Sequence, residues 1–188
     1  ERPLEYNQNY FFYRVYYCSV GMFKVGDKYW DATKRHLVRV LLDERVDVNG
    51  ARGDGATALL WAAHWDDGEA AELLLHAGAN VNAVNELGVT PLSLSALNAS
   101  AGMADALLRA GADPNAARPS GETVLMAGAR TGNAELVQAL LAAGADVNTA
   151  EQGRGQTALM WASNNGHADV VTALLAAGAN QRPRRSGA

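Results

Sequence analysis

A repeat of 33 residues runs through most of this chain and constrains its fold more than any other feature. The sequence aligns with itself in four copies, and each copy carries a Thr that is followed 21 positions later by a Gly. The threonines are Thr57, Thr90, Thr123 and Thr157, and the glycines are Gly78, Gly111, Gly144 and Gly178. A period of this length is typical of solenoids, whose units bury their apolar sides against their neighbours. Because a solenoid presents an extended surface rather than an enclosed pocket, the repeat favours a binding function.

Each copy predicts two short helices joined by a loop. In the first copy, residues 55–63 form the first expected helix and residues 69–75 the second. The Thr suits a helix N-terminus, where its hydroxyl accepts a hydrogen bond from a free backbone amide. Gly78 suits the left-handed stop after the second helix, because only Gly adopts that conformation without penalty. The Leu pairs near the end of each second helix supply a shared core: Leu74-Leu75, Leu107-Leu108, Leu140-Leu141 and Leu174-Leu175.

Three segments of this pattern resemble the ankyrin repeat family, of the bacterial type rich in Ala and Arg. They are Thr90-Pro91-Leu92, the segment from His76 to Ala83 (HAGANVNA), and the segment from Asn165 to Asn180 (NGHADVVTALLAAGAN). The resemblance covers about residues 36–181. It implies an all-α solenoid of helix-turn-helix units with β-turn fingers, about 4.5 repeats long. It also implies a non-enzymatic protein–protein interaction module, an adaptor or scaffold, that needs no cofactor.

The repeat register divides the chain into seven segments. An aromatic-rich arm or cap is expected before the repeats, then a partial repeat, four full repeats and a basic tail. Their expected ranges are 1–23 for the arm, 24–49 for the partial repeat, 50–82, 83–115, 116–148 and 149–181 for the full repeats, and 182–188 for the tail. The partial repeat matches only a second helix and its exit, with Arg45 in place of the usual Gly.

The sequence departs from the family pattern at two places, and each departure predicts a change in the structure. The His of the family's Thr-Pro-Leu-His motif is replaced in every copy, by Leu60, Ser93, Met126 and Met160. Without the hydrogen bonds of that His between units, we expect apolar packing to hold the stack together, with help from Trp61 and Trp161. The link before the last unit is one residue longer, at residues 151–155, and we expect it to distort one finger without breaking the stack.

The N-terminal arm has a different composition from the repeats. All six Tyr and all three Phe lie between residues 6 and 29, with Tyr10, Phe11, Phe12 and Tyr13 in a row. The arm either caps the exposed apolar flank of the first repeat or docks to a partner through its aromatic side chains. Docking would make the protein an accessory structural subunit of a larger, membrane-associated complex, and this arm would be its route of contact with the membrane.

The remaining composition argues against several other functions. The net charge of −4 gives no reason to expect nucleic-acid binding. A single cysteine excludes an intrachain disulfide framework, and no His or Cys group has the spacing of metal ligands. No catalytic constellation and no apolar run long enough to span a membrane is found. The start at Glu1 rather than Met favours the cell envelope or periplasm over the cytoplasm.

The family resemblance places the partner-binding surface on the finger tips and on the exposed face of each first helix. Carried over by position, the finger residues are Arg52, Asp54, Glu86, Leu87, Pro119, Glu122 and Arg154, and the helix residues are His64, Trp65, Leu97, Asn98, Arg130, Asn164 and Asn165. Trp65 and Leu87 are the first to test, because apolar side chains left exposed by a fold are common in interfaces. Isolated exposed apolar residues are also ordinary, and this reading stays open.

Overall fold

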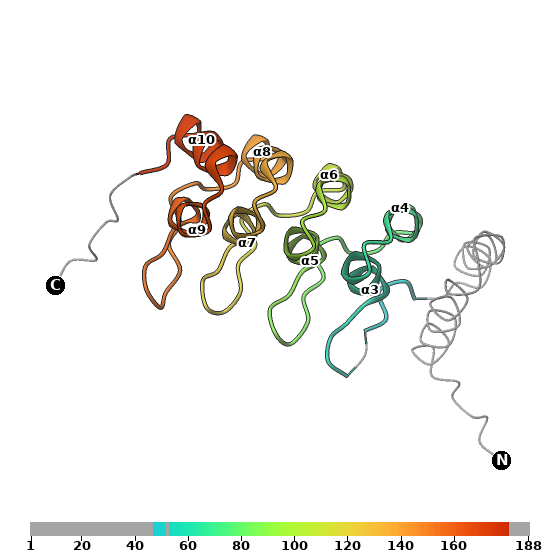
Figure 1. The fold of residues 1–188 in the computed structure, drawn as a ribbon. Helices are drawn as coiled ribbons and strands as arrows, with labels where there is room; N and C mark the ends of the chain where they lie inside the picture. The colour runs from blue at the N-terminus through green and yellow to red at the C-terminus, as the bar shows by residue number, and fades with distance from the viewer. Residues whose placement is uncertain (1–46, 52, 181–188) are drawn as a thin grey trace, which may run out of the picture.

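The computed structural model describes residues 47–51 and 53–180, and these form a stack of helix pairs (Figure 1). The eight α-helices of the described residues are α3 (Ala58–His64), α4 (Gly68–His76), α5 (Pro91–Leu97), α6 (Ala101–Arg109), α7 (Val124–Thr131), α8 (Ala134–Ala142), α9 (Ala158–Asn164) and α10 (Ala168–Ala176). The first helices of the pairs, α3, α5, α7 and α9, form one row, and the second helices form another. The long loops before the first helices project as fingers on the side away from the second row (Figure 1). The all-α solenoid expected from the repeat is thereby confirmed.

The Thr of each unit is the N-cap of its first helix, as the sequence predicts. The hydroxyl oxygens of Thr57, Thr90 and Thr123 each accept a hydrogen bond from the backbone amide three residues later. At Thr90 the cap is reciprocal, because the Ser93 hydroxyl also accepts from the Thr90 amide at 3.0 Å. Thr157 also occupies the N-cap position, but the predicted cap hydrogen bond is absent there, and its buried hydroxyl has no hydrogen-bond partner.

The glycine stops after the second helices are also confirmed. Gly78, Gly111, Gly144 and Gly178 all adopt the left-handed conformation, with φ between 88° and 93°. In the first unit the Ala79 amide then donates to the Leu74 carbonyl at 2.9 Å, so the turn satisfies a helix-terminal carbonyl. The expected core role of the Leu pairs holds fully for the first Leu of each pair (Leu74, Leu107, Leu140 and Leu174), which is buried. The second Leu is only partly buried in three pairs, and Leu175 is 38 % exposed.

Hydrogen bonds from asparagine side chains link successive units, contrary to the expectation that apolar packing takes over from the missing His. Four asparagines spaced by 33 residues each form two hydrogen bonds with the backbone of the next unit, and we call this series the polar ladder. Their Nδ2 groups donate to a glycine carbonyl at 3.1–3.2 Å and their Oδ1 atoms accept a backbone amide at 2.6–2.9 Å. The asparagines are Asn49, Asn82, Asn115 and Asn148, and the glycines are Gly78, Gly111, Gly144 and Gly178. Hydrogen bonds between units therefore persist, at a different position of the repeat.

The fingers are closed at their bases by one repeated backbone bond. The amide of Asn85 donates to the Val89 carbonyl at 3.2 Å, and that of Arg118 to the Glu122 carbonyl at 3.0 Å. In the last finger the equivalent bond runs from Glu151 to Gln156, also at 3.0 Å. The extra residue is therefore held within the finger, and the stack continues beyond it, as the sequence predicts.

Candidate functional site

The finger face is the side of the molecule made by the fingers and by the exposed side of α3, α5, α7 and α9 (Figure 1). Of the residues predicted to bind a partner, the structure leaves these exposed: Asp54, His64, Trp65, Glu86, Leu87, Asn98, Pro119, Arg154, Asn164 and Asn165. Leu97, Glu122 and Arg130 are partly buried. Arg52 and the arm residues Tyr10, Phe11, Phe12 and Tyr13 lie outside the described residues. The finger face is therefore built from charged, polar and apolar side chains.

An aromatic cluster lies on the first unit, at the end of α3. The rings of Trp61 and His64 meet edge to face at 5.8 Å between centroids, and those of His64 and Trp65 at 5.0 Å. Trp61 and His64 are one helical turn apart, which brings their side chains together. Trp65 follows as the C-cap of α3 and keeps 55 % of its surface exposed. A large aromatic surface thus packs edge to face against its neighbour and is left open to solvent.

The asparagines at the ends of the first helices are exposed, and two of them also donate hydrogen bonds to backbone carbonyls. Asn98 donates from Nδ2 to the carbonyls of Ala63 and His64, at 3.1 and 3.0 Å, and so ties α5 to the end of α3. Asn165 donates to the Trp161 carbonyl of its own helix at 2.8 Å. These bonds satisfy carbonyls at a helix end. Replacing Asn98 would therefore disturb the stack as well as the surface.

The second finger exposes the largest apolar fraction on this face. Leu87 is 74 % exposed near the finger tip. The backbone of the finger tip is held by Asn85, whose carboxamide oxygen accepts hydrogen bonds from the amides of Leu87 and Val89 at 3.0 and 2.9 Å. The Glu86 amide also donates to the Asp54 carbonyl of the preceding finger at 3.1 Å. Neighbouring fingers therefore brace each other, and Leu87 projects from a rigid support.

A charged cluster occupies the finger face between α5 and α9. Arg118 Nη1 lies 3.4 Å from Glu122 Oε2, and Arg130 Nη2 lies 3.8 Å from Glu122 Oε1. The Arg130 guanidinium carbon in turn lies 5.7 Å from the centroid of the Trp161 ring, within cation–π range. Sequence reasoning named Glu122 and Arg130 but missed Arg118. A signal was present: Arg118 and Glu122 have opposite charge and flank the same tight turn, where the hairpin brings its two sides together.

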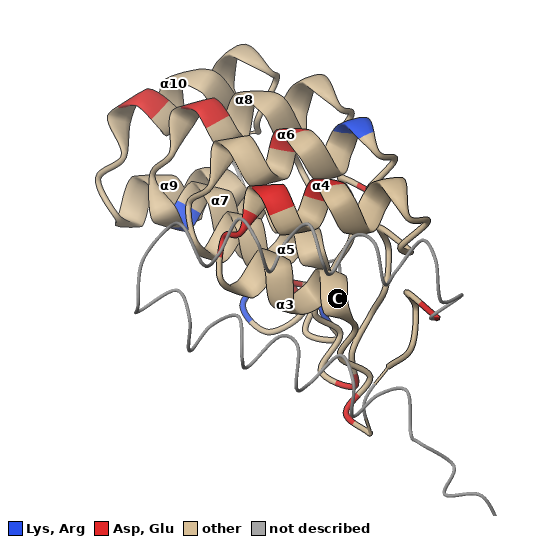
Figure 2. Cartoon of the chain, turned by 90° about the vertical axis from the view of Figure 1, so that its right-hand side faces the viewer, with Lys and Arg blue, Asp and Glu red and all other residues tan. Residues whose placement is uncertain are grey.

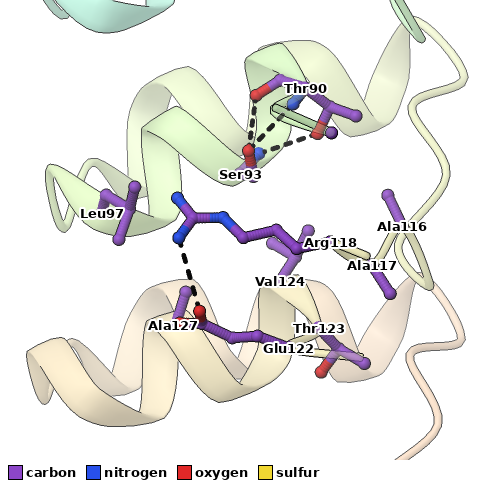
Figure 3. Close-up of a pocket in the computed structure, with 11 residues that line it drawn as sticks. Thr90, Ser93, Leu97, Ala116, Ala117, Arg118, Glu122, Thr123, Val124 and Ala127 are labelled. Carbon is purple, nitrogen blue, oxygen red and sulfur yellow. Dashed lines mark hydrogen bonds and ion pairs between the residues drawn. The ribbon is translucent and has the colours of Figure 1, made fainter. Parts of the chain in front are cut away.

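Arg118 also lines a shallow groove between two units (Figure 3). Its side chain extends along the groove between α5 and α7, toward Leu97, and its guanidinium is held from α7's side by Glu122 (Figure 3). Leu97, Val124 and Ala127 supply apolar walls. The groove therefore combines an apolar lining with a guanidinium group.

The longer fourth finger is organised by the carboxylate of Glu151. This group accepts hydrogen bonds from the amides of Gln156 at 3.2 Å, Arg154 at 2.6 Å and Gly153. These bonds, that from Gln156 first, lower the pKa of Glu151 below its usual value, and the Arg154 charge adds to the effect. The Glu151 carboxylate thus accepts hydrogen bonds from the amides of its own finger, as the Asn85 side chain does in the second finger.

No group of three or more His, Cys, Asp or Glu side chains within 47–51 and 53–180 is placed to hold a metal ion. None of the helices in these ranges is both long enough and apolar enough to cross a membrane.

The sequence matches a family model described as ankyrin repeats in three copies. The two matched segments are residues 30–118 and 92–185, so together they reach from the partial repeat to the tail. Among curated proteins, none matches the sequence significantly.

Proposed function

Because the chain belongs to the ankyrin repeat family, whose members are generally protein–protein interaction modules and typically not enzymes, we propose that it is an adaptor or scaffold that captures a partner protein on its finger face. The supporting observation is the exposed aromatic surface of Trp65. An indole that is 55 % exposed at a helix end contributes little to folding but is an efficient interface anchor.

The supporting geometry extends beyond this residue. His64 holds the Trp65 ring edge to face, so the ring is ordered before a partner binds, which lowers the entropy cost of binding. Leu87 offers a second apolar contact from a braced finger. The partner surface is proposed to comprise mainly Trp65, His64, Leu87, Arg130, Arg154 and Asn164.

The proposal is tested with Trp65→Ala and Leu87→Ser in a single variant. The wild-type chain and the variant are immobilised, exposed to an extract of the native source, and the captured proteins are identified and quantified by mass spectrometry. A partner enriched by the wild type should be lost, by about tenfold or more, from the variant. Its melting temperature and helical circular dichroism should be unchanged, because both side chains are exposed.

The matched control is Leu175→Ser, which removes an exposed apolar residue from α10 in the second-helix row. Capture by this control should equal that of the wild type. If the double variant captures the same partner as well as the wild type, the aromatic surface of the first unit is not the binding site.

The alternative, an accessory subunit docked by the aromatic arm, concerns residues outside the described part of the chain. It stays a separate hypothesis, and deletion of residues 6–23 tests it: the protein should leave its assembly while the stack remains folded.

A further inference from the structure

Basic side chains are rare on this stack and unevenly placed. Arg109, Arg118, Arg130 and Arg154 are the only Lys or Arg residues of the part that the structure describes, which holds fourteen Asp and Glu. The second-helix row is acidic along its length (Figure 2), with Glu69, Glu72, Asp105, Glu135 and Asp169. Its one arginine in these ranges, Arg109, is paired with Asp105 at 2.9 Å. The other three arginines all lie in the third and fourth units, on or beside the finger face.

Two of these arginines share one carboxylate. Glu122 lies between the guanidinium groups of Arg118 and Arg130, with N···O distances of 3.4 and 3.8 Å. Both distances exceed the 2.7–2.9 Å or so of a strong charge-assisted hydrogen bond. A guanidinium has five N–H donors, so a single carboxylate at these distances leaves most of them free for another acceptor. The cluster therefore carries one unneutralised positive charge.

The surroundings strengthen the attraction of this cluster for an anion. The side chains of Arg118, Arg130 and Glu122 are only 30 %, 39 % and 19 % exposed. Arg118 lies in the apolar groove between α5 and α7 (Figure 3), and Arg130 is stacked over Trp161. Reduced contact with water weakens the screening of a charge, so an anion bound here interacts more strongly than on an open surface.

We propose that Arg118, Glu122 and Arg130 form a carboxylate-binding subsite, which takes one Asp or Glu side chain from an acidic segment of the partner protein. The planar guanidinium groups match a carboxylate in geometry. One excess positive charge matches a single negative charge, whereas the Glu122 carboxylate would repel a doubly charged phosphate. The inference rests on the proposed function, because it assumes that the finger face binds a protein, and it names the chemistry of that partner.

The test begins with a selection of random twelve-residue peptides displayed on phage against the immobilised full chain. Enriched peptides should carry an Asp or Glu at a fixed place relative to an apolar residue. The dissociation constant of a fluorescently labelled enriched peptide is then measured by anisotropy. Exchange of its acidic residue for the amide should weaken binding about tenfold, as expected for a charge-assisted hydrogen bond.

Variants of the chain separate recognition from support of the fold. Arg118→Gln and Arg130→Gln should each weaken the acidic peptide about tenfold and have little effect on its amide form. Glu122→Gln should tighten binding about threefold, because it removes the carboxylate that competes for both guanidiniums. A cluster that only supports the finger would show the opposite, with Glu122→Gln weakening binding. Arg109→Gln is the matched control, since it breaks an arginine–carboxylate pair on the second-helix row, and it should leave binding unchanged.

The other outcomes are distinct. Enriched peptides that lack acidic residues, or whose binding ignores Arg118 and Arg130 but requires Trp65, overturn the subsite and leave the proposed function standing. A preference for a phosphorylated peptide over the carboxylate peptide also overturns it. If no peptide is enriched, or if binding ignores the whole finger face, the subsite and the proposed function fail together.

Discussion

The side chain of Asn115 reaches the carbonyl of Gly144 in the next unit, donating from Nδ2 across 3.1 Å. The same side chain accepts from the Asp146 amide at 2.7 Å. Two hydrogen bonds from one residue thus fix the turn of one unit against the turn of the next. Since the bonds recur at Asn49, Asn82 and Asn148, they set the spacing of neighbouring units along one edge of the stack.

Asn115→Ala should destabilise the protein by about 1–2 kcal/mol, because it removes both bonds and leaves the Gly144 carbonyl and the Asp146 amide without them. The free energy of unfolding from urea titration measures the effect. Asn165→Ala is the control, since that side chain bonds only within its own helix, and it should cost less than about 0.5 kcal/mol. Equal losses in the two variants would show that the ladder contributes nothing special to the stack.

The threonine caps predict different effects of one substitution at two equivalent positions. Thr90→Val removes a reciprocal cap with Ser93 and should cost about 1–2 kcal/mol. Thr157→Val should be neutral or stabilising, because the hydroxyl it removes is buried and makes no hydrogen bond. Thermal unfolding of the two variants provides the comparison. A loss at Thr157 as large as that at Thr90 would mean that its hydroxyl is satisfied in solution.

The sequence predicted the features that are local to one unit. Three of the four Thr caps, the glycine stops and the first Leu of each pair depend on a helix end or an apolar position within 33 residues, so a periodic pattern reveals them. Asn115 was equally periodic, but its role depends on a carbonyl 29 residues away, and nothing in the local pattern identifies that acceptor. Arg118 was missed for a similar reason. Its direction is set by the hairpin that brings it toward Glu122 and into the groove between α5 and α7.

The nesting of neighbouring fingers predicts a strong effect at Gly88. This residue has φ +70°, and a Cβ added there would lie 2.5 Å from Cδ of Pro119 on the next finger. Gly88→Ala should therefore combine left-handed strain of about 1–2 kcal/mol with a steric clash, and destabilise more than Gly78→Ala. Gly78 has a similar φ, +88°, but open space around it.

Gly102→Ala supplies the positive control for these glycine variants. Gly102 lies within α6, and an added Cβ would meet nothing within 4 Å. Alanine there should stabilise by about 0.5–1 kcal/mol, because it reduces the entropy of the unfolded chain. Urea unfolding should rank the variants Gly102→Ala, Gly78→Ala and Gly88→Ala in decreasing stability. If Gly88→Ala is no worse than Gly78→Ala, the fingers are not packed tightly against each other in solution.

The fourth finger should depend on pH through Glu151. Its pKa is lowered in the folded protein, chiefly by the Gln156, Arg154 and Gly153 amides that donate to the carboxylate. A group with a lowered folded pKa contributes stability that is fully present above its unfolded pKa, which is about 4.5 for this carboxyl. That stability is lost as the pH falls through the folded pKa. Glu151→Gln should therefore destabilise the finger at pH 7, and the difference from the wild type should shrink at pH 3. Hydrogen exchange of the Arg154 and Gln156 amides at the two pH values, corrected for intrinsic rates, measures this directly. A difference between the two proteins that does not change with pH would mean that the ionised carboxylate is not what holds the longer finger.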